Sequence, residues 1–583
     1  MPHATRRFHL VYLAALFAAT ACNRAGGPQE RPAAVGTAAD FPEGWRFAEG
    51  GEASFARDAM VSSNSDLASR AGVEIMAKGG NAVDAAVATG FALAVTHPQA
   101  GNLGGGGFMV IRMADGRTAA IDYREIAPLA ATRDMFIDAE GKLTDKSTVG
   151  ALASGVPGSV AGMTEALAKY GTMQLDEVMQ PAIRLASEGF IVDSALARSI
   201  AGTSSLLTRF EGASLLFPGG KPIGPGERLV QPALARTLRL IAEQGAKAFY
   251  RGEIADSIAA EMRRDGGIIT KEDLAGYKPL WREPIQSTYR GYKVIAMPPS
   301  SSGGITTVET LNILETYDQL PRFGSAEYDH LLAEAFRRAF IDRNTKLGDP
   351  AFVKVPVAEL TSKAYAKTLA SSIEDGQASR TPSFSASAGE PMHTTHYSVA
   401  DSKGNAVATT TTLNSSFGSG VYVRGAGFFM NNEMDDFSAQ PGHANQFGLV
   451  QGEANAIVPG KRMLSAMSPT IVLDKDDKLF LVVGAAGGPT IITATTQIIL
   501  NTIDNKMSLA DAMRAPRLHH QAWPDTLFYE RGGIVPARLD SLRAMGHQAV
   551  ARGSIANSNA VMRVEGGFDG LSEPRSSGGA VGY

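Results

Sequence analysis

The chain has 583 residues, of which 44% are hydrophobic and 20% are charged, an ordinary composition for a globular protein. Its formal net charge of −4, with no basic run, gives no electrostatic reason to expect a nucleic-acid partner. The length allows several ordinary domains or one large layered body with an extensive core.

An apolar leader opens the chain. Arg6 and Arg7 precede the apolar run 10–21, which is shorter than the ~20 residues of a membrane-spanning helix. The single cysteine, Cys22, ends that run in the sequence Ala-Thr-Ala-Cys, which resembles a bacterial lipobox. We therefore predict that residues 1–21 are a lipoprotein-type signal peptide and that a lipid on Cys22 anchors the protein in the bacterial periplasm. An ordinary signal peptide, cut after residue 21 or slightly later, is the alternative.

A lone cysteine in the leader also excludes an intrachain disulfide, a cysteine-based metal site and thiol catalysis in the folded body. Residues 22–52, rich in Gly, Pro and Ala, predict a flexible tether. Beyond the tether the chain becomes periodic, and helical segments dominate residues 159–370. The clearest patterns predict helices over 82–95 and 491–503 and strands over 108–111, 119–123, 396–400, 406–413 and 479–483. Such alternating blocks favour a layered α/β body, although periodicity alone does not choose its architecture.

The most informative junction lies at Thr394. Residues 371–393 are small, polar and aperiodic, as in an exposed loop, whereas a hairpin pattern follows directly, with its turn at 401–405. A threonine at such a junction becomes a new N-terminus if the bond before it is cut. Its freed α-amino group, with a reference pKa near ~8, then serves as a base for its own hydroxyl group.

The motifs around this threonine resemble one family in order and spacing. TTHYSVADSKGNAVATTTTLNSSFGSG, MNNEMDDFSAQPG, KRMLSAMSPTIV and GAAGGPTIITA resemble the small subunit of gamma-glutamyltranspeptidase, and GNLGGGGFMVIRMADGRTAAIDYREIAP and MPPSSSGG resemble its large subunit. The resemblance implies an α/β, four-layer αββα sandwich of the N-terminal-nucleophile hydrolase type, built from two fragments of one precursor. It places self-cleavage between His393 and Thr394, so that a large subunit (53–393) and a small catalytic subunit (394–583) form a heterodimer.

The resemblance also assigns catalytic roles. Thr394 is the expected nucleophile; Thr395 is the competing candidate, but the family pattern puts the cut before the first threonine of the pair. Thr412 is expected to hydrogen-bond the nucleophile, although a strand threonine needs no such role. Gly487 and Gly488, between a strand and a helix, suit an oxyanion hole made of backbone N–H groups. No phosphate-binding glycine motif accompanies them, so nucleotide binding is not expected.

A γ-glutamyl donor carries an α-ammonium and an α-carboxylate group, so its site needs both acceptors and a cation. By resemblance, Asn414, Glu433 and Asp436 bind the ammonium group, while Arg124 and Ser465 bind the carboxylate group. The plainer interpretation of each charged residue is a solvated loop charge or a surface ion pair. The matching set favours a donor pocket.

Two departures from the family bear on that pocket. Ala466 replaces the second serine of a pair that holds the carboxylate, and Phe447 replaces the tyrosine usual in the lid loop. The glycines 104–107 either contact the substrate or only allow tight packing. His519 and His520 lack a third ligand pattern, so we interpret them as structural and expect no metal.

The sequence therefore predicts an exported, self-cleaving gamma-glutamyltransferase or glutathione hydrolase that needs no cofactor. Glutathione and other γ-glutamyl compounds are the expected donors, and water, amino acids or peptides are the acceptors. A related acylase, of the glutaryl-type β-lactam or poly-γ-glutamate-processing kind, is the nearest alternative. A non-catalytic envelope binding protein is a more distant one.

Overall fold

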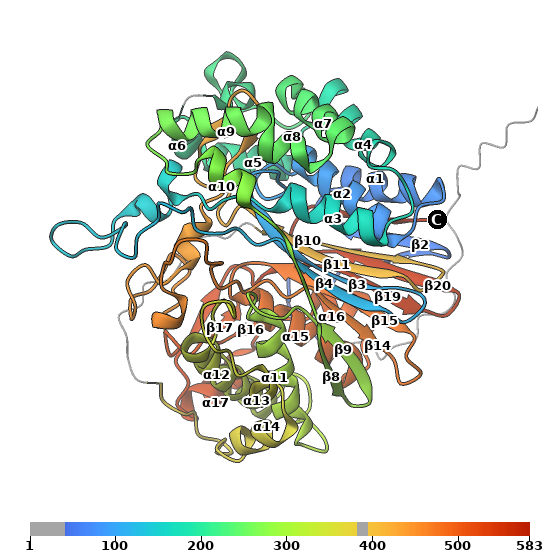
Figure 1. Ribbon diagram of the computed structural model, residues 1–583. Coiled ribbons are helices and arrows are strands. Elements are labelled where there is room, and N and C mark those ends of the chain that lie inside the picture. The colour runs from blue at the N-terminus through green and yellow to red at the C-terminus, as the bar shows by residue number, and fades with distance from the viewer. Residues whose placement is uncertain (1–40, 211, 382–393) are drawn as a thin grey trace, which may run out of the picture.

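The computed structural model describes residues 41–210, 212–381 and 394–583, so the predictions for residues 1–21, Cys22 and His393 lie outside the described residues. Two seven-stranded antiparallel sheets form the centre of the described part (Figure 1). In order across the first sheet, the strands are β1 (Ser54–Ala56), β20 (Gly567–Ser572), β19 (Asn557–Val564), β15 (Leu479–Ala486), β14 (Thr470–Leu473), β9 (Tyr292–Ala296) and β8 (Ile285–Tyr289). Across the second sheet they are β21 (Gly579–Gly582), β2 (Ala59–Ser63), β10 (Thr394–Asp401), β11 (Ala406–Thr412), β3 (Gly106–Arg112), β4 (Thr118–Asp122) and β7 (Leu280–Arg282).

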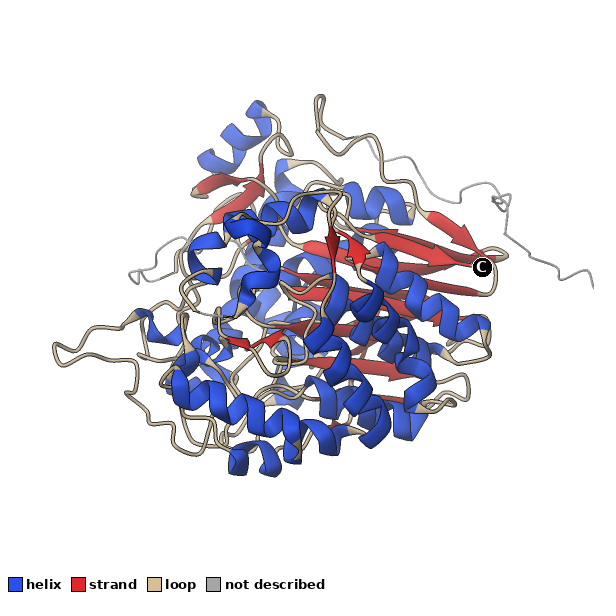
Figure 2. Cartoon of the chain, turned by 90° about the horizontal axis from the view of Figure 1, so that it is seen from above, coloured by secondary structure: helices blue, strands red, loops and turns tan. Residues whose placement is uncertain are grey.

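Helices cover the outer face of each sheet, so that four layers result (Figures 1 and 2). Over the second sheet lie α1 (Asp66–Ala77), α2 (Ala82–Thr96), α3 (Ser159–Tyr170), α4 (Leu175–Glu188), α5 (Ser194–Gly202), α6 (Ser204–Leu207), α7 (Pro232–Gln244), α8 (Ala246–Arg251), α9 (Glu253–Arg264) and α10 (Lys271–Gly276). Over the first lie α11 (Gly303–Glu315), α12 (Ala326–Lys346), α13 (Val357–Leu360), α14 (Lys363–Ala370), α15 (Thr490–Ile503), α16 (Leu509–Arg514) and α17 (Pro536–Ala544). The predicted four-layer αββα sandwich is confirmed.

Alternation along the strands sorts side chains between the layers. In β10, Tyr397 and Val399 pack into the core beneath α2, whereas Ala400 belongs to the core between the two sheets. Successive side chains of a strand point to opposite faces, and both faces of β10 are covered. Because both faces are covered, no residue of β10 faces solvent, and its polar side chains are buried as well.

The β10–β11 hairpin forms where the sequence predicts it. The Oδ1 atom of Asp401 accepts hydrogen bonds from the backbone N–H groups of Lys403 and Asn405, both at 3.0 Å, and so closes the turn. The register pairs Thr394 with Thr412. The first and last residues of the hairpin are therefore direct neighbours.

Both sheets interleave the two predicted fragments. In the second sheet, β10 and β11 lie between β2 and β3, which precede the predicted cleavage site. In the first, four strands after the site lie between β1 and β9. Cutting the chain before Thr394 would leave these ladders intact, so the fragments would remain one body.

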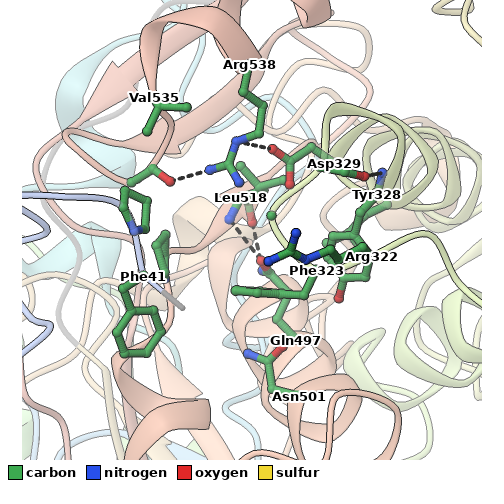
Figure 3. Close-up of a pocket in the computed structure, with 16 residues that line it drawn as sticks. Phe41, Arg322, Phe323, Tyr328, Asp329, Gln497, Asn501, Leu518, Val535 and Arg538 are labelled. Carbon is green, nitrogen blue, oxygen red and sulfur yellow. Dashed lines mark hydrogen bonds and ion pairs between the residues drawn. The ribbon is translucent and has the colours of Figure 1, made fainter. Parts of the chain in front are cut away.

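Two predictions about local structure need adjustment. The helix-dominated stretch 159–370 contains β7, β8 and β9, which are short strands at the sheet edges and too brief to show a strand period. The predicted tether ends earlier than residue 52, because Trp45 is buried and its indole N–H donates to the carbonyl group of Arg514 at 2.9 Å. Close by, Phe41 forms one wall of a cavity of about 240 Å³ (Figure 3).

The described helices include no span that is both long and apolar enough to cross a membrane. Three further small sheets lie outside the sandwich. They comprise β5 (Phe190–Ile191) with β6 (Arg228–Leu229), β12 (Tyr422–Val423) with β13 (Phe428–Phe429), and β16 (Leu518–His519) with β17 (Leu527–Glu530) and β18 (Ala549–Arg552).

Candidate active site

Thr394 begins β10 at the end of the sandwich, and its side chain faces Thr412. The two Oγ1 atoms lie 3.2 Å apart, and the Oγ1 atom of Thr412 also accepts a hydrogen bond of 2.8 Å from the backbone N–H of Asn414. Thr395 points to the other face of the sheet, where its hydroxyl group donates to Asn64 at 3.1 Å. Of the two candidate nucleophiles, Thr394 lines a pocket that Thr395 does not line.

That pocket brings together residues from distant parts of the chain, and we call it the charged pocket. Its lining residues are Arg124, Arg343, Thr394, Thr412, Asn414, Glu433, Asp436, Phe447, Leu449, Ser465, Ala466, Met467, Gly488, Pro489 and Ile491. All five residues predicted to bind the donor are among them, together with the two threonines and one of the two predicted glycines. The sequence therefore predicts the composition of the pocket well, although it does not supply the roles.

The glycine turn lies between β15 and α15. Gly487 has φ +137° and Gly488 has φ +55°, conformations that L side chains rarely adopt. A Cβ atom on Gly487 would lie 2.5 Å from Thr490 Oγ1. The turn leads into the N-terminus of α15, which is the positive end of the helix dipole. Such a turn suits the stabilisation of an oxyanion formed at Thr394.

Arg124 forms the base of the charged pocket and is fully buried. One arm of its guanidinium fork donates to Glu433 and the other donates to Asp436. The cation expected to hold a substrate carboxylate is therefore paired with the two carboxyl groups expected to hold the ammonium group. A bound zwitterion would have to exchange these pairings for its own.

Two arginines and two carboxyl groups line the pocket, and a third carboxyl group, that of Glu125, pairs with Arg124 outside the lining. Burial raises the pKa values of Glu433 and Asp436, against the lowering effect of Arg124. Burial likewise raises the pKa of Glu125 to about 7, and the Oε2 atom of Glu125 lies 3.7 Å from the Arg124 guanidinium. Neither Glu125 oxygen, nor Oε2 of Glu433, has a hydrogen-bond partner among the described residues. An added cation would find acceptors here.

Arg343 is the residue of this site that sequence reasoning missed. It projects from α12, is almost completely buried, and donates to the Ser302 hydroxyl at 3.2 Å and to Asn344 Oδ1 at 3.0 Å. Burial lowers its pKa to about 10. Its sequence context gives no distinguishing signal, because α12 contains further charged residues that are equally buried, such as Glu334 and Asp342.

The predicted lid covers the pocket with apolar side chains. Phe447 packs in one small core cluster with Leu449, Ala466 and Trp523, and Gln521 donates to the Phe447 and Gly448 carbonyl groups at 3.3 and 3.0 Å. The remaining cavity is about 20 Å³, too small for a glutamyl group. A donor therefore enters only when the lid side chains move.

Ser465 and the glycines 104–107 contribute differently. The Ser465 hydroxyl accepts from the Met467 N–H at 3.1 Å, which leaves its own hydrogen available to a ligand. None of the four glycines lines the pocket. A Cβ atom on Gly105 would lie 2.1 Å from the Thr412 carbonyl oxygen, so close packing explains at least that glycine.

His519 and His520 are buried beside the site. His519 bonds to Thr493 Oγ1 at 3.0 Å and to Gln521 Oε1 at 2.8 Å, and burial lowers its pKa to about 3. Within residues 41–210, 212–381 and 394–583, no three His, Cys, Asp or Glu side chains are arranged to hold a metal ion.

Comparison with known proteins gives a consistent result. The sequence profile described as Gamma-glutamyltranspeptidase matches residues 68–583. A protein of Escherichia coli (strain K12) named glutathione hydrolase proenzyme is 48% identical, over 97% of this chain and 97% of its own length.

Solved structures agree. The crystal structure of cephalosporin acylase from Bacillus halodurans has a TM-score of 0.81 at 30% identity and covers 93% of this chain and 99% of its own. That of Helicobacter pylori gamma-glutamyltranspeptidase has a TM-score of 0.53 at 45% identity and covers 54% of this chain and 91% of its own.

Proposed function

The chain belongs to the gamma-glutamyltranspeptidase family, and from that premise we propose the roles of its pocket residues in a γ-glutamyl transfer through Thr394. It is a self-processing gamma-glutamyltransferase/glutathione hydrolase that acts on small-molecule substrates. The observation that carries the assignment of roles is the opening of Thr394 into the charged pocket beside Thr412.

In the proposed reaction, the free α-amino group of Thr394 takes the proton of its own hydroxyl group as Oγ1 attacks the γ-carbonyl carbon of the donor. Backbone N–H groups of Gly487 and Gly488 stabilise the oxyanion. The C–N bond then breaks, the leaving amine takes the proton back, and an ester remains on Thr394. Water or an acceptor amine attacks this ester and releases glutamate or a new γ-glutamyl amide.

Substrate recognition follows from charge. We propose that Asp436, Glu433 and Asn414 hold the donor's α-ammonium group, and that Arg124 and Ser465 hold its α-carboxylate group. Supporting this, Glu433 and Asp436 share the Arg124 cation, and Oε2 of Glu433 has no hydrogen-bond partner among the described residues. An ammonium ion would find an acceptor there. Arg343 adds a second guanidinium that faces the same cavity.

The acylase alternative has a specific observation in its favour, namely the likeness to a cephalosporin acylase. A glutaryl donor has no α-ammonium group, so it would leave the buried Glu433 and Asp436 without a ligand. We therefore expect kcat/KM for a γ-glutamyl anilide to exceed that for the matched glutaryl anilide. The reverse order would assign the pocket to the acylase.

Self-cleavage supplies the central test. Wild-type protein should yield a small fragment that begins at Thr394, as read by N-terminal sequencing, and Thr394→Ala should remain one chain without transferase activity. A small fragment with any other first residue, or an active Thr394→Ala protein, would contradict the assignment. An intact but inactive wild-type chain would favour the binding-protein alternative.

Location is a separate proposal. The leader and Cys22 support export to the periplasm and a lipid anchor. Wild-type protein should take up labelled fatty acid and fractionate with membranes, while Cys22→Ser should do neither and keep its activity. Wild-type protein recovered unlabelled in the soluble periplasmic fraction would rule out the anchor.

A further inference from the structure

A second buried ionic cluster lies on α12, on the side that faces the end of the large fragment. It consists of Glu334, Arg337 and Arg338 from α12 and Asp525 from the loop between β16 and β17, and we call it the tail clamp. Its four members surround residues 372–381, the last described residues before the predicted cleavage site. The reaction proposed above uses none of them.

Arg337 is the centre of the tail clamp. Its Nε atom donates to Glu334 at 3.0 Å, and its Nη1 atom donates to the Thr381 hydroxyl at 2.7 Å and pairs with Asp525. The other oxygen of Asp525 accepts from the Thr381 backbone N–H at 3.0 Å. Thr381 is thus held through both its main chain and its side chain.

Further contacts extend this hold along the segment. Glu334 accepts from the Ser379 N–H at 3.2 Å, and Arg338 donates to the Ser379 hydroxyl at 3.2 Å and to the Ser372 carbonyl at 2.6 Å. The Ala378 N–H donates to the carbonyl of Met545 at 2.8 Å. The segment therefore lies on the body as an ordered strap.

Both carboxylates of the tail clamp are paired with guanidinium groups. Although burial opposes ionisation, Arg337, Ser379 and Arg338 lower the pKa of Glu334 to about 2. Hydrogen bonds from His520 and Arg337 likewise outweigh burial and lower the pKa of Asp525. Both carboxylates are charged at neutral pH, so two anions face two guanidinium groups.

We propose that Arg337 and Asp525 are positioning residues for self-cleavage, because they fix the chain on the N-terminal side of the bond that Thr394 attacks. Strand β10 already fixes the other side. With Thr381 held, twelve residues, 382–393, separate the hold from Thr394. Because Thr394 attacks the carbonyl group of the residue bonded to it, the hold acts on the orientation of the scissile bond and not on how often the reacting groups meet.

The inference rests on the self-cleavage proposed above and adds a consequence for the mature enzyme. Arg337 belongs to the large fragment and Asp525 to the small one. After cleavage, their ion pair would tie the end of the large fragment to its partner. Cleavage speed and the hold on the tail would then depend on the same pair.

The test compares precursors made in a short cell-free pulse, with the first-order cleavage rate read on denaturing gels. Arg337→Gln and Asp525→Asn are the test variants, and Arg538→Gln is the matched control. Arg538 also joins the two fragments through an ion pair to α12, with Asp329 at 3.2 Å (Figure 3). Its hydrogen bond goes to the Gly533 carbonyl group and not to the strap. The kcat and KM of each matured protein are the second readout.

We expect both test variants to cleave at least about threefold more slowly because the scissile bond is less well oriented, Asp525→Glu to recover part of the rate, and Arg538→Gln to stay within about twofold of wild type. Once matured, all should share the wild-type kcat and KM. Equal slowing by Arg538→Gln, or a wild-type rate in the test variants, would overturn the inference. If Arg337→Gln does not fold, Thr381→Val removes only the hydroxyl acceptor and is expected to slow cleavage. A wild-type precursor that never cleaves would overturn the proposed self-cleavage as well.

Discussion

Two buried clusters in this protein are built from the same groups, arginines and carboxylates, and both span the predicted fragments. In the charged pocket, Glu125 and Glu433 have raised pKa values and carboxyl oxygens without partners. In the tail clamp, Glu334 and Asp525 have lowered pKa values, and each is bound by an arginine and a backbone N–H. Composition is therefore a poor guide to the electrostatics of a buried cluster.

The balance of charge explains the difference. The clamp pairs two carboxylates with two guanidinium groups at short range, so that ionisation is favoured in spite of burial. In the pocket, Arg124 pairs with Glu125, Glu433 and Asp436. Arg343 forms its hydrogen bonds to neutral groups and adds a longer-range attraction for Asp436. An incomplete cluster can take a charged ligand, whereas a complete one holds structure together.

The largest expected effect is the difference in kcat/KM between variants that lose the central arginine of one cluster or of the other. Arg124→Gln removes the guanidinium group proposed to bind the donor's carboxylate group. Truncating one partner of a buried, hydrogen-bonded charge pair costs about 2–5 kcal/mol of binding, so kcat/KM for γ-glutamyl donors should fall at least ~30-fold. Matured Arg337→Gln should keep near-wild-type kcat/KM. Steady-state kinetics with a γ-glutamyl anilide measures both. Similar losses in the two variants would erase the functional distinction between the clusters.

The next largest expected effect is on the pH dependence of the free energy of unfolding. The folded-state pKa of Glu334, about 2, lies below its ordinary value of 4.5. The ionised carboxylate therefore contributes fully to the free energy of unfolding above the ordinary value, and this contribution is lost as the pH falls towards 2. In the uncleaved Thr394→Ala background, Glu334→Gln should lower the free energy of unfolding by about 3 kcal/mol at pH 7. The difference should shrink below pH ~4.5 in urea titrations. A difference that is constant from pH 7 to 3 would mean that Glu334 stabilises by packing alone.

The sequence could predict the parts of this site that are local. The hairpin pattern around residues 401–405 implies that Thr394 and Thr412 face each other, and the structure pairs them. The glycines before α15 are visible as a turn between strand and helix. Family motifs supply Arg124 and Asp436, which lie far from the hairpin in sequence.

What the sequence could not predict depends on long-range packing. Arg343 reaches the pocket only because α12 packs against the segment that contains Ser302, and no local pattern encodes that contact. The tail clamp joins Thr381 to Asp525 across the predicted cleavage site. The pairing of Arg124 with Glu433 depends equally on three-dimensional placement, which inverts the simple expectation of an arginine free for substrate.

A smaller effect should appear in the pH dependence of ligand binding. Glu125, with its pKa raised to about 7, is mostly neutral below that pH and negative above it. A ligand's ammonium group should therefore bind more tightly as pH rises through 7, and competitive inhibition by L-glutamate should strengthen by about fivefold.

Glu125→Gln should abolish this strengthening of L-glutamate inhibition with rising pH. Asp435 is the matched control, because its pKa is also raised to about 7 by burial, but its side chain bonds to Ser147, whereas that of Glu125 pairs with Arg124. Asp435→Asn should keep this pH dependence. If the pH dependence is lost in the Asp435 variant and kept in the Glu125 variant, Glu125 is not the group that titrates.

The smallest expected effect comes from a substitution of Ala466 in the charged pocket. Ala466 is buried beside Phe447 and Leu449, next to Ser465, whose hydroxyl group is available to a ligand carboxylate. A serine hydroxyl at 466 would add one donor, and a hydrogen bond to a charged group contributes roughly 1.5–3 kcal/mol. Exchange with water and the apolar surroundings of Phe447 reduce that gain.

We therefore expect Ala466→Ser to raise kcat/KM for γ-glutamyl donors by about three- to tenfold, and to leave 4-aminobutyryl donors unchanged because they lack the α-carboxylate. Ala466→Gly, which adds no donor, is the control for altered lid packing. The tail clamp makes no contact with this position, so the self-cleavage rate should stay at the wild-type value. Equal gains for both donor classes would mean that the substitution acts through the lid, and the carboxylate would then be held by Arg124 and Ser465 without a place for a third donor.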